Sequence, residues 1–359
     1  MSRPVRARIS TQALRHNYQR VKSLAPSSKI MSVVKADAYG HGMELVATAL
    51  NKSDGFAVAS TEEGIRLRET GLIQPIVLLS GFFSDKELPM LTGYQLSPVI
   101  HSLWQVDLLE KYSGNQFINA WLKFDSGMHR LGLDRKNLET VVERLRAKDN
   151  ICISGIMTHL ANADDPADDT TRQQLEEYKK LRNVITDGES SIANSAGIVG
   201  WPDSHADWVR PGIMLYGSSP MRFKTVTELD LRPVMHFESQ LIAISRRKAG
   251  ERVGYGGDWL CEHDTTIGVV AAGYGDGYPR HAPPGTPVAV NGKRVPLIGR
   301  VSMDLITVDL GRQARVRLGD PVELWGEHVY ADEVALMSNT IAYELFCHVT
   351  RRVQRIAVD

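Results

Sequence analysis

A lysine near the amino terminus is the first candidate for chemistry in this sequence. The apolar run 30–34 is typical of a buried strand, and it brings Lys35 to its carboxyl end, just before a turn that contains Gly40 and Gly42. Most lysines are solvated surface groups, so Lys35 by itself is more simply explained as the polar end of a strand than as a reactive amine. The residues that follow later strands change this balance.

Polar and cationic residues follow several other apolar runs in the same way. They are Tyr39 after the first run, Lys123 and Arg130 at 118–130, His159 after 151–157, Asn194 and Ser195 after 191–193, and Arg210 within 209–216. Each has a structural explanation when taken alone; a single histidine after a strand, for example, is more often a hydrogen-bonded structural residue than a catalyst. Their common position at strand ends is what suggests a shared site.

The elements that would position these residues alternate between strands and helices. The expected strands are 30–34, 56–59, 76–79, 96–100, 118–124, 151–157, 191–193 and 209–216. The expected helices are 11–24, 43–50, 61–70, 85–91, 103–111, 136–147 and 170–185, with a short apolar segment near Ile198. This α/β pattern predicts a (β/α)₈ TIM barrel over residues 10–230, a fold in which chemistry occurs at the carboxyl ends of the strands.

The second part of the chain favours a mainly β domain, made of residues 231–359 together with 1–9. Its expected strands are 3–9, 234–245, 266–272, 286–290, 294–298, 304–310, 321–325 and 353–358. The pair Asn291-Gly292 between two apolar runs is a strong signal for a type I′ hairpin, and one helix is expected over about 331–349.

The composition excludes several classes of protein. Lysine plus arginine equals aspartate plus glutamate at 42 each, so no bulk charge attracts nucleic acid or a membrane surface. Cys152, Cys261 and Cys347 are odd in number and widely spaced, which argues against disulfides and zinc and favours buried thiols in the cytoplasm. The acidic run 164–169 lies in a loop before a helix, where such residues cap and solvate, and no metal is expected. The glycine clusters match no nucleotide-binding motif.

The motifs of this chain resemble those of the bacterial alanine racemase family, whose members use pyridoxal phosphate on a barrel. The resemblance runs along the whole chain and rests on residues 34–42, 123–132, 194–196, 210–217, 253–257 and 299–304. Two departures are Asp37, where the family commonly has Asn, and Ser126, where it commonly has Thr. Both conserve size and polarity.

This resemblance implies the interconversion of L-alanine and D-alanine. Because enantiomers have equal free energy, a racemase needs a carbanion stabiliser and a proton carrier on each face of the substrate carbon. By resemblance Lys35 forms the Schiff base with the cofactor and serves one face, and Tyr255 serves the other. An ordinary phenol, with a pKa of about 10, is a poor base near neutral pH, so Tyr255 needs cationic or hydrogen-bond support. By resemblance His159 is linked to that tyrosine and Arg210 to the pyridine nitrogen of the cofactor, and these two residues are expected to provide it.

The resemblance also implies a set of binding residues. Cofactor binding is expected from Lys35, Tyr39, His159, Asn194, Ser195, Arg210, Gly212, Ile213 and Tyr343. Arg130 and the Met303 N–H are expected to hold the substrate carboxylate, and Lys123 is expected to be carbamylated. Arg210 at the pyridine nitrogen cannot accept a proton from it, so that nitrogen should stay neutral, which would limit transamination.

Family members bring Tyr255 and Met303 to the barrel of a partner chain, so the sequence predicts a homodimer with shared active sites. Three alternatives stay open at this point. A decarboxylase of the same fold would carry a glutamate in place of Arg210, a non-catalytic cofactor carrier would lack the β domain, and a cofactor-free barrel enzyme would not bind pyridoxal phosphate. The sequence also leaves open whether the activity supplies D-alanine for peptidoglycan or serves alanine catabolism.

Overall fold

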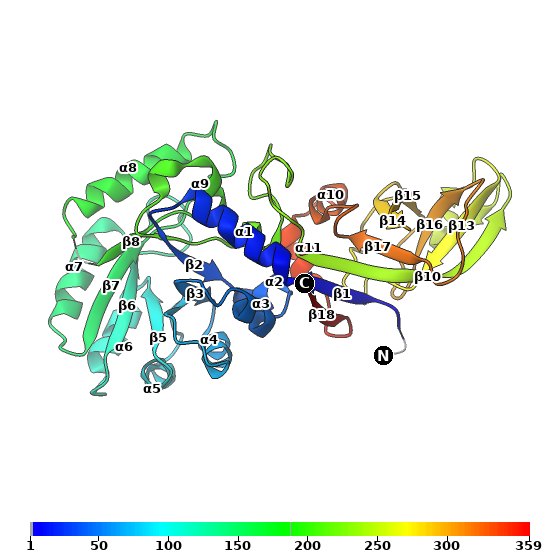
Figure 1. Cartoon of the computed structure of the whole chain (residues 1–359). Helices are drawn as coiled ribbons and strands as arrows, with labels where there is room; N and C mark the ends of the chain where they lie inside the picture. Colours follow the sequence, from blue (N-terminus) through cyan, green and yellow to red (C-terminus); the bar gives the residue numbers. More distant parts are fainter. Residues whose placement is uncertain (1–2, 187) are drawn as a thin grey trace.

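The computed structural model describes residues 3–186 and 188–359 and contains two lobes (Figure 1). Within these residues, eight parallel strands close into a barrel in chain order. They are β2 (Lys29–Val33), β3 (Gly55–Val58), β4 (Ile76–Leu78), β5 (Leu96–Ile100), β6 (Ile118–Lys123), β7 (Ile151–Met157), β8 (Glu189–Ser191) and β9 (Trp208–Val209). The prediction of a (β/α)₈ barrel is therefore confirmed.

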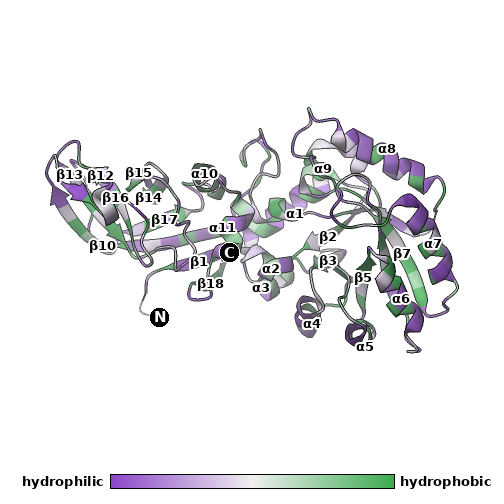
Figure 2. Cartoon of the chain, turned by 180° about the vertical axis from the view of Figure 1, so that it is seen from behind, coloured by the Kyte–Doolittle hydropathy of each residue, from purple (hydrophilic) through white to green (hydrophobic). Residues whose placement is uncertain are grey.

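Helices surround the barrel on the outside. They are α1 (Thr11–Leu24), α3 (Met43–Ala49), α4 (Thr61–Glu69), α5 (Leu88–Gly93), α6 (Leu103–Lys111), α7 (Arg135–Arg146), α8 (Thr170–Arg182) and α9 (Ser195–Gly200), with 3₁₀ turns η1 (Asp85–Glu87), η2 (Pro202–Ser204) and η3 (Ile213–Tyr216). The segment α2 (Lys35–Tyr39) is a left-handed turn that follows β2. In α7, Asp134 caps the first turn through the Asn137 N–H at 2.8 Å, and four apolar residues at helical spacing are buried. Figure 2 shows the result: α7 and α8 are largely hydrophilic, whereas the strand β7 beside α7 is mostly hydrophobic.

The second lobe is mainly β, as predicted. Its sheet contains β1 (Arg6–Ser10), β10 (Met235–Arg247), β13 (Thr265–Val270), β14 (Pro287–Val290), β15 (Lys293–Ile298), β16 (Ile306–Gly311), β17 (Pro321–Trp325) and β18 (Gln354–Val358). The strand order is β13-β16-β15-β14-β17-β10-β1-β18, and β10 also pairs with β13, which closes most of the sheet on itself. The first strand thus lies in this lobe, antiparallel to β10 and parallel to β18.

Smaller elements complete the β-rich lobe. These are the hairpin β11 (Arg252–Val253) and β12 (Trp259–Leu260), the turn η4 (Tyr255–Gly257), and the helices α10 (Ala331–Met337) and α11 (Ala342–His348). Helix α11 lies at the junction of the two lobes, close to α2 and to the C-terminal strand β18 (Figure 1). No helix among the described residues is long and apolar enough to cross a membrane.

Two expected elements were wrong in detail. The run 209–216 is not one strand: β9 ends at Val209, and η3 follows after Gly212, with the Tyr216 hydroxyl donating to the Val33 carbonyl at 2.8 Å. The expected helix 331–349 is broken between α10 and α11, where Asn339 has φ +52°. Asparagine tolerates this left-handed conformation, and the break lets α11 take its own direction toward the barrel.

Candidate active site

A cavity of about 1270 Å³ opens at the carboxyl ends of the barrel strands. Most of the residues expected from the sequence lie around it, although they come from distant segments. Those that line it are Lys35, Tyr39, Lys123, Arg130, His159, Asn194, Ser195, Arg210, Gly212, Ile213 and Tyr343. Tyr255 and Met303 are absent from this lining.

A left-handed turn follows Lys35 directly. Ala36, Asp37, Ala38 and Tyr39 all have φ of 53–54°, a conformation that costs L-residues roughly 1–2 kcal/mol each. The Ala36 N–H donates to the Glu63 carboxylate at 2.7 Å, which helps to hold the start of the turn. This unusual turn places Lys35 and Tyr39 on the wall of the same cavity.

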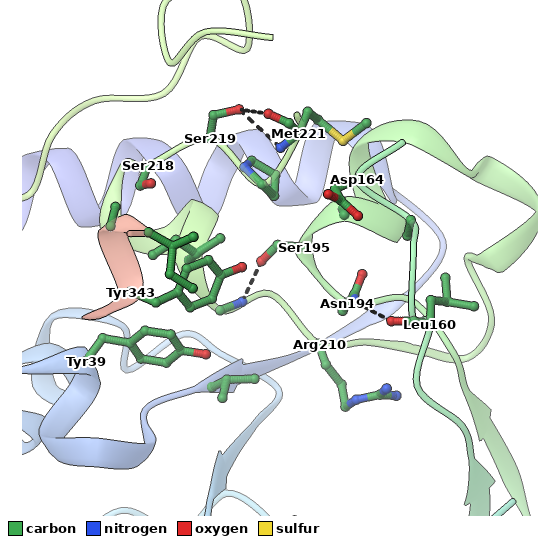
Figure 3. A pocket seen from close by; sticks show the side chains of 18 of the residues that line it. Tyr39, Leu160, Asp164, Asn194, Ser195, Arg210, Ser218, Ser219, Met221 and Tyr343 are labelled. Carbon is green, nitrogen blue, oxygen red and sulfur yellow. Dashed lines mark hydrogen bonds between the residues drawn. The ribbon is translucent and has the colours of Figure 1, made fainter. Parts of the chain in front are cut away.

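A cluster of hydroxyl and N–H groups forms one wall of the cavity. Ser195 Oγ accepts a hydrogen bond from the Gly212 N–H at 2.8 Å, and the Asn194 side chain caps α9 through the Gly197 N–H at 2.9 Å. A Cβ at residue 212 would lie only 2.6 Å from the Tyr39 hydroxyl, so the close approach requires glycine. Figure 3 shows the hydroxyls of Tyr39 and Tyr343 pointing toward this same region. Such a wall suits an anion with several oxygen atoms.

Positive charge dominates the floor of the cavity. Burial, followed by the nearby charges of Arg210, Arg130 and Lys35, lowers the pKa of Lys123 to about 8. Burial and the charge of Arg130 also lower the pKa of Lys35. Both amines are therefore easier to deprotonate than an ordinary lysine, which makes each a better nucleophile or base near neutral pH.

Arg210 is a buried cation held by neutral groups. Its guanidinium donates to Ser191 Oγ at 2.6 Å and to the carbonyls of Thr158 at 2.5 Å and Ile192 at 3.1 Å. Among the described residues, no carboxylate forms an ion pair with it. Burial lowers the pKa of Arg210 to about 10, so the group remains a cation at neutral pH.

His159 lies beside this arginine, with its Nδ1 3.4 Å from Arg210 Nη2. Burial lowers the pKa of His159 well below its usual value, and the charges of Arg210 and Lys123 act in the same direction. The imidazole is therefore neutral at physiological pH and can accept a hydrogen bond from a neighbouring donor.

The two remaining expected residues lie on the β-rich lobe. Tyr255 begins η4 between two glycines with positive φ, and 68% of its surface is exposed. Met303 is 54% exposed and precedes Asp304, whose carboxylate accepts a hydrogen bond from Arg352 at 2.6 Å. A single chain thus carries a cavity and, elsewhere, an exposed tyrosine and methionine that do not reach it.

Several residues that hold the site together were not predicted from the sequence. Gln174 on α8 donates to the His159 carbonyl at 3.0 Å and accepts from the Ala161 N–H at 2.9 Å, and Ser191 supports Arg210. Nothing in the local sequence marks these contacts, because they join segments far apart along the chain. The expectation of three buried cysteines was also wrong: Cys261 is buried, but Cys152 and Cys347 are exposed, and Cys347 lines the cavity because it follows Tyr343 by one turn of α11.

Comparison with known proteins gives matches along nearly the whole chain. The models of the alanine racemase N-terminal and C-terminal domains match residues 9–220 and 234–357. The alanine racemase of Aeromonas hydrophila is 49% identical over 348 residues, which cover 97% of each chain. The catabolic alanine racemase of Pseudomonas putida is 46% identical over 350 residues, covering 97% of this chain and 98% of that one.

A solved structure agrees with these sequence matches. The crystal structure of the biosynthetic alanine racemase from Pseudomonas aeruginosa has a TM-score of 0.96 and 43% sequence identity. The match covers 99% of this chain and 100% of the Pseudomonas aeruginosa chain. Both lobes therefore have counterparts in that structure.

The left-handed turn generates a prediction about stability. Replacing Ala36 with glycine removes a Cβ from a left-handed position and should stabilise the protein by up to about 1 kcal/mol, whereas Ala36→Val should destabilise it by at least about 1 kcal/mol. Urea unfolding at one fixed protein and cofactor concentration measures both. Ala49→Gly, at the end of the right-handed helix α3, is the matched control and should destabilise. Equal losses for Ala36→Gly and Ala49→Gly would contradict the strain argument.

Proposed function

Since the chain belongs to the alanine racemase family, we propose that it interconverts L-alanine and D-alanine with the Lys35 amine on one face of the substrate carbon and the Tyr255 phenol on the other. The alanine racemase activity and the use of pyridoxal phosphate follow from family membership. The chain is thus an isomerase whose substrate is alanine. The residue roles are our proposal, and its main support is the convergence of Lys35, Tyr39, Ser195 and Gly212 on one cavity.

The residues around the cavity fit pyridoxal phosphate. An amine with a lowered pKa, a wall of hydroxyl and N–H donors, and a buried cation match its aldehyde, its phosphate and its pyridine nitrogen, respectively. We propose that Lys35 holds the aldehyde carbon, and that Arg210 and His159 lie against the ring. The phosphate would bind Tyr39, Asn194, Ser195, Gly212, Ile213 and Tyr343, which all line the cavity. When bound, this cofactor supplies an electron sink that stabilises negative charge on the substrate carbon.

The protein's own groups would then move the protons. The lowered pKa of Lys35 makes its free amine available as a base near neutral pH. The phenol of Tyr255 has to approach from the opposite face, where the neutral imidazole of His159 can accept a hydrogen bond from it. Arg210 donates to carbonyls and to Ser191, and its Nη2 also lies 3.4 Å from Nδ1 of His159, which helps to orient that imidazole.

Arg130 is the proposed partner of the substrate carboxylate, with help from the Met303 N–H. The amines of Lys35 and Lys123 repel Arg130 when they are protonated. A carbamate on Lys123 carries a negative charge, so it would attract Arg130 instead. The pKa of about 8 for Lys123 favours this modification, because only an unprotonated amine reacts with carbon dioxide. We therefore propose that Lys123 is carbamylated and orients Arg130.

We propose a homodimer in which each β-rich lobe completes the partner's cavity. The exposed Tyr255 and Met303 support this arrangement, because the proposed roles of both residues require a barrel that their own chain does not bring to them. The division into a barrel domain, 10–230, and a second domain, 231–359 with 1–9, also remains a proposal, which the separate family matches support.

The cellular role can be one of two. Relatives carry the names of biosynthetic and of catabolic alanine racemases, so we propose either supply of D-alanine for peptidoglycan or service in alanine catabolism. We also propose a cytoplasmic location, since the three cysteines are free thiols.

The first test of the two-base proposal follows exchange at the substrate carbon. The holoenzyme incubated with L-alanine in D₂O should incorporate deuterium while optical rotation falls to zero. Tyr255→Phe should lower racemisation by at least about a hundredfold, since it removes the proton carrier of one face. Deuterium uptake without loss of rotation in the wild type would instead indicate that one face alone is served, and a fully active Tyr255→Phe would reject the role of the phenol.

Subunit complementation tests the shared site. Lys35→Ala and Tyr255→Ala homodimers should each be inactive, but mixing them under conditions that exchange subunits should produce heterodimers with one intact site. Recovered activity should approach about a quarter of the wild-type value, because half of the dimers are mixed and each has one of two sites. Mass spectrometry of tagged subunits confirms exchange, and an inactive mixture after exchange would place the site within one chain.

The Lys123 modification generates a prediction about pH. With ¹³C-labelled bicarbonate, a carbamate carbon signal should appear in the NMR spectrum of the wild type and be missing from Lys123→Arg. Its intensity should rise as the pH passes upward through about 8, because the amine loses its proton there. An unmodified lysine at pH 9 under saturating bicarbonate would remove this proposal.

A further inference from the structure

One side chain of the C-terminal strand β18, Arg355, reaches from the β-rich lobe to the barrel. Arg355 Nε donates to the Gly40 carbonyl at 2.6 Å, at the end of the left-handed turn. Its two other nitrogens donate to the carbonyls of Val349 at 2.9 Å, Val353 at 3.3 Å and Thr350 at 3.5 Å. Among the described residues, Arg355 forms no ion pair. The guanidinium of Arg355 therefore connects the turn to the segment that follows α11 through hydrogen bonds to backbone carbonyls.

The turn and α11 are also in direct contact. A Cβ at residue 40 would lie 2.0 Å from the Phe346 carbonyl oxygen, so the two backbones touch at Gly40. The neighbouring His41 ring is completely buried and lies 4.6 Å from the Tyr216 ring and 5.0 Å from the Phe346 ring. Arg355 therefore spans two pieces of backbone that are already packed together, and Figure 1 shows α2, α11 and β18 meeting at this junction.

Each of the two pieces carries one tyrosine of the cavity. Tyr39 immediately precedes Gly40, and Tyr343 lies on the first turn of α11. Their ring centroids are 5.8 Å apart, and Figure 3 shows both rings extending to the same side, with the Tyr343 hydroxyl near Ser195. The spacing of these hydroxyls depends on the position of the turn relative to α11, and Arg355 donates both to the turn and to the segment that directly follows α11.

We propose that Arg355 is a positioning residue for the phosphate group of the cofactor: by holding the Gly40 turn and α11 together, it sets the spacing of the Tyr39 and Tyr343 hydroxyls. The inference rests on the proposed function, in which both hydroxyls bind the phosphate. It adds a residue of the β-rich lobe, outside the cavity, to the determinants of cofactor affinity.

The test compares two ligands that differ only in the phosphate. Apo-protein is titrated with pyridoxal 5′-phosphate and, separately, with pyridoxal, and binding is followed by absorbance. Arg355→Gln should weaken binding of the phosphorylated ligand by about ten- to a hundredfold, the range expected for losing hydrogen bonds from a charged donor, and should change pyridoxal binding by less than about threefold. Arg355→Lys keeps the charge but lacks the planar set of donors, so it should restore part of the loss.

The matched control is Arg8→Gln. Arg8 lies opposite Ile356 of β18 in the same sheet, but within the described part of the chain its guanidinium bonds only to the Glu238 carboxylate, at 2.9 Å. This control should leave both affinities unchanged. If Arg355→Gln and Arg355→Lys lower the affinities for both ligands equally, or lower neither affinity, Arg355 does not position the phosphate site. Circular dichroism confirms folding, and Arg355→Lys keeps the test decisive if Arg355→Gln does not fold.

The variant Tyr343→Phe distinguishes a failure of the proposed phosphate site from a failure of the positioning role of Arg355. This variant should also weaken the binding of pyridoxal 5′-phosphate and leave the binding of pyridoxal nearly unchanged. The double variant with Arg355→Gln should lose less affinity than the product of the two single losses, because both substitutions act on one contact. If Tyr343→Phe has no effect, the proposed phosphate site is wrong. If it has the expected effect while Arg355→Gln has none, or the two effects multiply fully, the positioning role alone is rejected.

Discussion

The concentration of positive charge at one mouth of the barrel is the constraint on which the site depends. Lys35, Lys123, Arg130 and Arg210 all line one cavity, and burial makes the charges of Lys35, Lys123 and Arg210 more costly than in water. The protein resolves this in two ways. The lysines and His159 shift toward their neutral forms, and Arg210 keeps its charge by donating to carbonyls and a serine hydroxyl. What remains is a pocket suited to anions, into which a phosphate and a carboxylate can both fit.

The barrel supplies this pocket by topology, because parallel strands leave their carboxyl ends at one rim. Residues as distant as Lys35 and Arg210 thereby become neighbours without any local signal between them. The β-rich lobe has a different task. It presents Tyr255 and Met303 on tight, glycine-containing loops at its surface, and it sends β18 and α11 back to the barrel. The two lobes are therefore connected by more than a linker, and the site depends on both.

The sequence predicted the barrel, the β-rich lobe and the residues that line the cavity, because strand ends and family motifs are local features. It failed where structure depends on distant contacts or on rare backbone conformations. The segment Ala-Asp-Ala-Tyr contains no glycine, so nothing suggested that residues 36–39 are left-handed. The four buried apolar residues Ile213–Tyr216 have a sequence pattern that is compatible with a strand as well as with a 3₁₀ turn. The apolar pattern continues past Asn339, which hid the break between α10 and α11. Gln174 and Arg355 act on backbone groups that no pattern identifies.

The contact between Arg355 and Gly40 has a consequence for the order in which the protein is made. Its two residues are 315 positions apart, so the segment around Gly40 leaves the ribosome long before its partner is synthesised. Left-handed residues are strained, and although Glu63 holds the start of this turn, the hydrogen bond to its last carbonyl, at Gly40, arrives with β18. The barrel strands can assemble during translation, but the turn after Lys35 gains its hydrogen bond at Gly40 only when the C-terminal strand emerges.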